Sequence, residues 1–190
     1  MRAFIGFEIP ENIRKLYVST CKSLHGSCDI SFIRLDKMHI TLAFFHDLPE
    51  KDMEVIKNIL LDIKTEQFEI NCENIRLFKR KGIPSTVFIK IVSQGLKDYV
   101  EKLHTKLKEA GINFDDRRPY TPHITLARIN EMINEQDFSK NYRYIAKSFQ
   151  PSSFYVESVH LFSSNMISYK KEISEDFIKI FNDEEINEEI

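Results

Sequence analysis

The pentapeptide His-Ile-Thr-Leu-Ala occurs twice in this chain of 190 residues, at His39–Ala43 and again at His123–Ala127. A composition estimate expects its core, His-x-Thr-Leu, only about 0.02 times in such a chain. Side chains alternate between the two faces of a β-strand, so His39 and Thr41 share one face while the apolar residues share the other. Each copy therefore predicts a strand that is anchored by apolar side chains and carries an imidazole and a hydroxyl on its open face.

The segments around the two pentapeptides predict a mixture of strands and helices. Strands are expected at about 2–8, 30–35, 38–45, 68–78, 86–92, 143–149, 154–162 and 167–173, and helices at about 10–24, 49–63, 94–110 and 131–138. Many neighbouring strands can form hairpins, so the order indicates an α+β fold with antiparallel sheets. Each pentapeptide is followed by a turn, a helix and further strands, which predicts two related lobes that flank a central groove, with the helices outside. No linker separates the lobes, so residues 1–190 are expected to form a single domain of pseudo-duplicated lobes, each carrying one His-x-Thr motif.

The repeated residue types suit acid–base chemistry at phosphorus. An imidazole has an unperturbed pKa of about 6.5, so one ring can be neutral while a second is protonated near neutral pH. One ring can then take a proton from water while the other gives a proton to the leaving oxygen. A threonine hydroxyl on the same face can donate to a phosphate oxygen. We therefore predict His39 and His123 as catalytic residues and Thr41 and Thr125 as phosphate contacts. The predicted reaction is cleavage of a phosphoester that requires no metal and no cofactor.

Paired His-x-Thr motifs in apolar strands resemble the two-histidine (2H) phosphoesterase superfamily. The order from Arg2–Gly6 through Met38–Phe44 to Pro122–Arg128 is similar to that of the RNA 2′,3′-cyclic phosphodiesterases, also called 2′-5′ RNA ligases. The resemblance spans nearly the whole chain. It implies an RNA 2′,3′-cyclic 3′-phosphodiesterase that hydrolyses 2′,3′-cyclic phosphates to 2′-phosphomonoesters, with 2′-5′ RNA ligation as the reverse activity. The implied partners are RNA or an oligonucleotide with such an end, and small cyclic nucleotides.

The resemblance also implies roles for individual residues. His39 would be the general acid, His123 the general base, and Arg128 a further phosphate contact. Arg128 lies five residues beyond His123, so strict alternation would turn it away from the groove. A strand end or a β-bulge there is needed to bring it back.

Two groups of weaker candidates accompany the motifs. Lys79, Arg80 and Lys81 form the most concentrated cationic run, in an expected loop at 79–85. Relatives often carry a basic residue just after this loop and this chain does not, so the run is a candidate RNA contact, although such runs are usually solvated loops. Tyr120 could stack a base at the mouth of the groove.

Three further assignments depend on parity and spacing. Phe44 belongs by parity to the core. Cys21, His25 and Cys28 could serve as metal ligands, but their spacing favours a helix end with partly buried cysteines. The acidic segment 183–189 is expected to be a frayed end.

Bulk properties limit the class of protein. A net charge of −2 with 29% charged residues does not mark a nucleic-acid coat protein, so an anionic substrate must be held by local cations. No stretch of eighteen apolar residues exists, which excludes a membrane span. The N-terminus resembles a strand rather than a secretory signal, and three cysteines without Cys-x-x-Cys spacing suit a reducing compartment. We expect a cytoplasmic monomer.

Two other functions stay open at this point. One is another two-histidine phosphoesterase, acting on a different cyclic phosphate or on a 2′-5′ linkage. The other is a non-catalytic RNA- or nucleotide-binding module, in which substitution of either histidine would leave turnover at the background level. The intact pair of motifs favours the enzyme.

Overall fold

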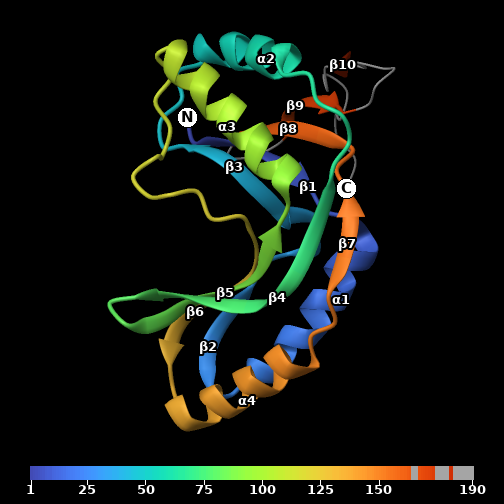
Figure 1. Ribbon diagram of the computed structural model, residues 1–190. Helices are drawn as coiled ribbons and strands as arrows, with labels where there is room; N and C mark the ends of the chain where they lie inside the picture. Colours follow the sequence, from blue (N-terminus) through green and yellow to red (C-terminus); the bar gives the residue numbers. More distant parts are fainter. Residues whose placement is uncertain (164–166, 174–179, 182–190) are drawn as a thin grey trace, which may run out of the picture.

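The computed structural model describes residues 1–163, 167–173 and 180–181 (Figure 1). The acidic segment 183–189, for which a frayed end was predicted, lies outside them. The strands are β1 (Ala3–Glu8), β2 (Cys28–Phe32), β3 (His39–Phe45), β4 (Glu69–Arg80), β5 (Ile83–Val92), β6 (His123–Met132), β7 (Ser152–Tyr155), β8 (Ser158–Ser163), β9 (Ile167–Glu172) and β10 (Ile180–Phe181). The helices are α1 (Glu11–Cys21), α2 (Asp52–Asp62), α3 (Gln94–Glu109) and α4 (Glu135–Ser148), with short 3₁₀ turns η1 (Lys22–Leu24) and η2 (Leu35–Lys37).

The strands form one hydrogen-bonded antiparallel sheet in the order β10-β9-β8-β1-β3-β6-β5-β4-β7, with β2 added to β6. The central strands β3 and β6 share only one pair of facing residues, Ile40 and Ile124. The sheet therefore consists of two halves joined at this pair. Helices α2 and α3 lie against the half with β1, β3 and β8, and α1 and α4 against the half with β4 and β6 (Figure 1). The predicted α+β fold with antiparallel strands and outer helices is confirmed.

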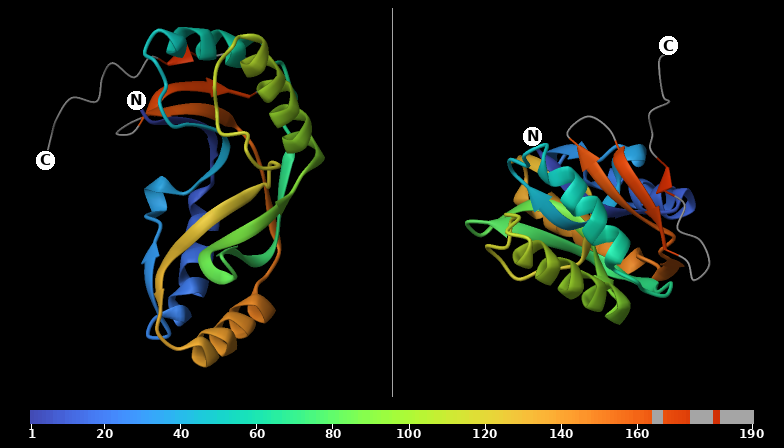
Figure 2. Two further views of the ribbon diagram at one scale, coloured as in Figure 1. Left: turned by 90° about the vertical axis from the view of Figure 1, so that its left-hand side faces the viewer. Right: turned by 90° about the horizontal axis from the view of Figure 1, so that it is seen from above.

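The two halves are not successive segments of the chain. Strands β1 and β3 belong to one half, β2 and β4 to β7 belong to the other, and β8 to β10 return to the first (Figure 2). The chain thus crosses between the halves several times. Any duplication therefore concerns the arrangement in space: β3, β1 and β8 in one half correspond to β6, β5 and β4 in the other.

Helix α3 illustrates how the local sequence sets an element. Its predicted apolar stripe, Leu96, Tyr99, Val100, Leu103 and Leu107, is buried. The helix begins after Ser93, whose hydroxyl accepts a hydrogen bond from the N–H of Leu96, and it stops before Gly111, whose φ of +71° is left-handed. The N-cap, the apolar stripe and the glycine after the helix all indicate the same helix, and the predicted boundaries are correct to within one residue.

The segment after the second motif was predicted wrongly. Strand β6 continues to Met132 where a helix was expected at 131–138, and helix α4 occupies most of 143–149, where a strand was expected. Asn134 starts α4, because its side chain accepts hydrogen bonds from the N–H groups of Gln136 and Asp137. Only Phe138 and Ile145 are buried in this polar helix, so its apolar period is too sparse to distinguish it from a strand.

Two other predictions are corrected by strand pairing. The predicted loop at 79–85 is a hairpin in which Lys81 and Gly82 alone form the turn, with φ values of +52° and +84°. Lys79 and Arg80 therefore belong to β4. The single strand predicted at 154–162 is two strands, β7 and β8, because β7 pairs with β4 in one half and β8 pairs with β1 in the other.

Candidate active site

The two histidines begin the two strands that join the halves. The pairing of Ile40 with Ile124 sets His39 opposite Thr125 and His123 opposite Thr41 along the antiparallel register. The alternating apolar residues of both motifs are buried, whereas the two histidines and two threonines are half-buried. The four polar side chains thus share one open face at the junction of the halves.

Both imidazoles are held in the same way. Nδ1 of His39 lies 2.7 Å from the carbonyl oxygen of Lys37, and Nδ1 of His123 lies 2.7 Å from the carbonyl oxygen of Thr121. A carbonyl can only accept, so Nδ1 carries the proton and donates in each ring. Nε2 is therefore the titrating nitrogen of both rings. It accepts a proton in the neutral form and donates one in the charged form.

Each imidazole is supported by phenylalanines from the next two strands on its own side of the sheet. Phe4 of β1 stacks on His39 at a centroid distance of 4.3 Å, and Phe162 of β8 stacks on Phe4 at 4.6 Å. Phe78 of β4 and Phe88 of β5 meet His123 edge-on, at 4.9 Å and 5.5 Å. Aromatic contacts of this kind restrict ring rotation. Both histidines are thus fixed by the backbone on one side and by aromatic rings on another.

The surroundings lower the pKa of both imidazoles. Burial lowers the pKa of His39, the carbonyl of Lys37 opposes this effect, and the charges of His123 and Arg14 lower the pKa further. Burial also lowers the pKa of His123, against the opposing effect of the Thr121 carbonyl. Because a charge on His123 disfavours a charge on His39, the two rings bind one proton more readily than two.

A β-bulge interrupts each motif at its leucine. In the pairing of β1 with β3, Ile5 faces Ala43 and Gly6 faces Thr41, which leaves Leu42 as the extra residue. The pairing of β5 with β6 repeats this pattern and leaves Leu126 as the extra residue. The bulge reverses the alternation of faces for every later residue of the strand.

The bulge returns Arg128 to the open face, which resolves the parity conflict found in the sequence. Arg128 faces Thr86 across β5, is exposed, and makes no side-chain hydrogen bond or ion pair with any residue that the structure describes. Phe44 is the equivalent residue of the first motif. Its assignment to the core was wrong, because the same bulge turns it to the open face, where it is half-buried with the Arg2 guanidinium 5.5 Å from its ring.

The weaker candidates lie around this face without converging on it. The hydroxyl of Tyr120 donates to the carbonyl of Thr41 at 3.0 Å, and burial raises the pKa of this phenol. Tyr120 therefore fastens the 112–122 segment to β3. Lys79, Arg80 and Lys81 are exposed at the tip of the β4–β5 hairpin.

The cysteines lie away from the motifs. Cys21 and Cys28 are buried as free thiols, and burial raises the pKa of the Cys21 thiol to about 12. The Cys28 thiol donates to the carbonyl of Leu24, and the His25 ring packs against Phe32 at 4.9 Å. Cys21 ends α1, as expected, whereas Cys28 begins β2, and both side chains are fully rather than partly buried.

Sequence reasoning missed the four phenylalanines and Arg14. Phe4 lies on the same face of β1 as Gly6, the residue opposite Thr41, but this relation depends on which strands pair and in what register. Arg14 follows the helix start at Pro10, and no local pattern distinguishes it from the neighbouring Lys15.

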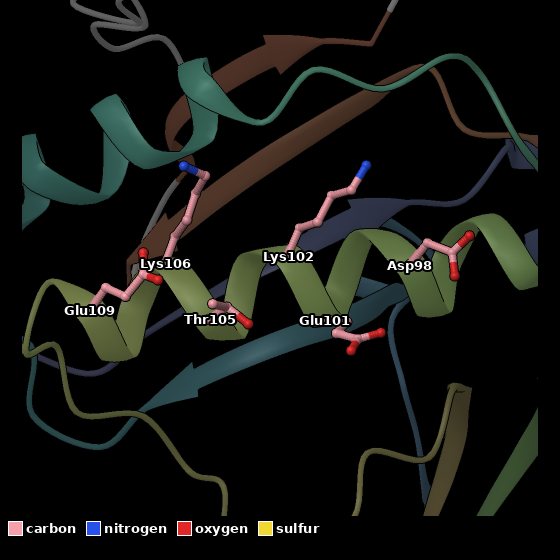
Figure 3. Close-up of a pocket in the computed structure, with 6 residues that line it drawn as sticks. All are labelled: Asp98, Glu101, Lys102, Thr105, Lys106 and Glu109. Carbon is pink, nitrogen blue, oxygen red and sulfur yellow. The ribbon is translucent and has the colours of Figure 1, made fainter.

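A separate hollow lies on the outer face of α3. Its lining residues all come from this helix and carry both signs of charge: Asp98, Glu101, Lys102, Thr105, Lys106 and Glu109 (Figure 3). Lys106 is already paired with Asp62 of α2. None of these residues belongs to β3 or β6, so the hollow is not part of the histidine site. Within the described residues, no helix is both long and apolar enough to cross a membrane.

Comparison with solved structures defines the class of fold. The crystal structure of TT0787 of Thermus thermophilus matches 93% of this chain and 100% of its own, at 20% identity and a TM-score of 0.73. Escherichia coli LigT complexed with 3′-AMP matches 95% of this chain and 93% of its own, at 18% identity and a TM-score of 0.66. The fold and the paired motifs are those of a two-histidine phosphoesterase.

The family follows from the sequence match. Residues 6–185 match the model of the AKAP7 2′5′ RNA ligase-like domain, and the chain belongs to this family. This chain is also similar to proteins named RNA 2′,3′-cyclic phosphodiesterase. The one from Archaeoglobus fulgidus is 26% identical over 130 residues, 68% of this chain and 73% of that protein. The one from Bacillus subtilis is 29% identical over 129 residues, 66% of this chain and 69% of that protein.

Proposed function

We propose that the protein hydrolyses 2′,3′-cyclic phosphates, at RNA ends or in small cyclic nucleotides, to 2′-phosphomonoesters. One observation carries this proposal: two half-buried imidazoles, each with Nδ1 bonded to a carbonyl of its own chain, share a face with two threonine hydroxyls. The names of the relatives and the 3′-AMP in the LigT structure support a nucleotide substrate.

In the proposed mechanism, Nε2 of His123 takes a proton from water as the water oxygen attacks phosphorus. The bond between phosphorus and O3′ breaks, and Nε2 of His39 gives its proton to O3′. The products are a 2′-phosphomonoester and a free 3′-hydroxyl. The proton gained by His123 equals the proton lost by His39, so exchange with solvent restores the starting state.

The other polar groups of the open face would stabilise charge on the phosphate. The hydroxyls of Thr41 and Thr125 would donate to the two non-bridging oxygens, one from each motif. Arg128 would contribute a guanidinium that is free of other partners among the described residues. If a 5′-hydroxyl of a second RNA replaced water as nucleophile, the same steps would yield a 2′-5′ phosphodiester.

The roles of the two histidines can be tested by substitution. Either His39→Ala or His123→Ala is expected to lower kcat/KM at least about 10³-fold, because each ring transfers a proton in the same step. His46→Ala, which removes an exposed histidine just beyond β3, serves as the matched control. Phosphorus NMR of the products, with and without EDTA, measures turnover and the position of the phosphate. A 3′-phosphate product, or loss of activity with EDTA, would contradict the mechanism.

A second substrate tests which histidine is the general acid and which is the general base. With sulfur in place of O3′, the leaving thiolate needs little protonation, because a thiol has a pKa of about 8.5. The sulfur substrate should restore much of the activity of His39→Ala and little of that of His123→Ala. The opposite result would exchange the two roles. Turnover of a 2′-5′-linked dinucleotide but of no cyclic phosphate would assign the chain to the alternative phosphoesterase activity.

A further inference from the structure

Arg14 has no ion-pair partner among the residues that the structure describes, although its charge contributes to lowering the pKa of Glu11. It lies in the first half of α1 and is half-buried, and its Nε atom is buried without a hydrogen-bond partner. Its guanidinium makes no hydrogen bond or ion pair within the part of the chain that the structure describes. The nearest acidic residue on the helix, Glu11, is already paired with Lys15 at 2.6 Å. Partly buried charges are normally paired, so this guanidinium is suited to an external anion.

The position of α1 connects Arg14 to the active site. The helix contacts η2, the turn that leads directly into His39, and it also contacts β6, the strand that begins with His123. The charge of Arg14 lowers the pKa of His39, whereas it is not among the groups that shift the pKa of His123. The reacting phosphate must lie between the two imidazoles. Of the two imidazoles, Arg14 therefore acts on His39, and we assign it to the His39 side of the site.

The proposed function indicates which anion comes to that side. If His39 protonates O3′, the terminal ribose lies on the side of His39. In RNA, the O5′ of this ribose carries the preceding phosphodiester, whereas in a nucleoside 2′,3′-cyclic phosphate it is a free hydroxyl. The next negative charge of an RNA chain is thus on the same side of the site as Arg14.

We propose that Arg14 binds the phosphodiester on the 5′ side of the terminal ribose, and that the protein therefore prefers RNA ends to cyclic mononucleotides. This inference rests on the proposed function and on His39 as the residue nearest the leaving oxygen. A guanidinium presents several donors to phosphate oxygens, and Nε is one of them. Arg14 is a specificity residue in this scheme, because it touches the substrate away from the reacting atoms.

The experiment compares three substrates. They are a dinucleotide ending in a 2′,3′-cyclic phosphate, the same dinucleotide with a neutral methylphosphonate linkage, and the nucleoside 2′,3′-cyclic phosphate. Arg14→Ala should lower kcat/KM about 10- to 100-fold on the charged dinucleotide, mainly through KM, and by less than about twofold on the mononucleotide. The kcat/KM of the wild-type protein should be lower by a similar factor on the methylphosphonate dinucleotide than on the charged dinucleotide. On the methylphosphonate dinucleotide, Arg14→Ala should cause no further loss of kcat/KM.

Lys15→Ala is the matched control, because it removes the same charge from the next residue of α1. Lys15 is exposed and paired with Glu11, so its loss should change each rate by less than about twofold. Equal losses for Arg14→Ala on the mononucleotide and the dinucleotide would overturn the proposal. Equal kcat/KM values of the wild-type protein on the charged and the methylphosphonate dinucleotides would also overturn it. This second result does not depend on the folding of any variant. If the wild-type protein cleaves none of the substrates, the proposed function fails and this inference falls with it.

Discussion

Gly6 of β1 lies against the backbone of the first motif, and Gly6→Ala should damage catalysis as well as stability. A Cβ atom at Gly6 would lie 2.8 Å from the carbonyl oxygen of Ile40, whereas ordinary contacts begin at 3.4 Å. The two strands must separate by about 0.6 Å to accept it. Ile40 lies between His39 and Thr41 and forms the single pair that joins the halves. The added methyl group therefore displaces both polar residues of the motif.

The size of the effect follows from this displacement. Since a 1 Å misplacement can cost about 100-fold in rate, a shift of roughly half that size or slightly more should lower kcat at least about tenfold. Overpacking of this kind costs about 2 kcal/mol of stability, or about 4–8 °C in Tm for a chain of this size. The assay measures kcat on a cyclic nucleotide well below the lowered Tm, together with a thermal melt.

Gly111→Ala separates destabilisation from misplacement. Gly111 has a φ of +71° and nothing within 4 Å of an added Cβ, so alanine there is strained without touching a neighbour. We expect a loss of about 1–2 kcal/mol with kcat unchanged to within about twofold. If Gly6→Ala keeps its full kcat, or if Gly111→Ala loses as much, the geometric argument is refuted.

Two further predictions concern stability. Folding lowers the pKa values of His39 and His123, so the unfolded chain binds protons more readily than the folded protein does. The stability contributed by the two neutral rings is therefore present above about pH 6.5, and it is lost as the pH falls through the lower native pKa values. Thermal melts across this range should show a steeper acid decline for the wild-type protein than for the double His→Gln variant, and equal slopes would contradict the sign. Lys171 is 5% exposed and donates to three backbone carbonyls at the end of α2, so Lys171→Met should cost about 3 kcal/mol in chemical denaturation. Lys102→Met on the exposed face of α3 is the control, and a Lys171→Met protein as stable as the wild type would show that these hydrogen bonds contribute nothing.

Local patterns predicted the parts of the site that depend on single strands. The alternation of His39, Ile40 and Thr41 indicated a strand with polar groups on one face, and burial of Ile40 bears this out. The stripe of α3 and its glycine stop predicted that helix to within one residue. Both cases succeed because burial on one face leaves a periodic trace in the sequence. The same reasoning failed for α4, which buries too few apolar residues to leave a clear period.

Tertiary pairing decided the relation between the two motifs. Nothing within either pentapeptide indicates that Ile40 pairs with Ile124, or that a bulge follows each threonine and turns Arg128 and Phe44 to the same face as the histidines. The stacking of Phe4 on His39 and the burial of the Nε atom of Arg14 also depend on residues distant in sequence. Side-chain alternation is a local property of one strand. Register and partner choice follow from burial summed over the whole sheet, so they become visible only in the folded chain.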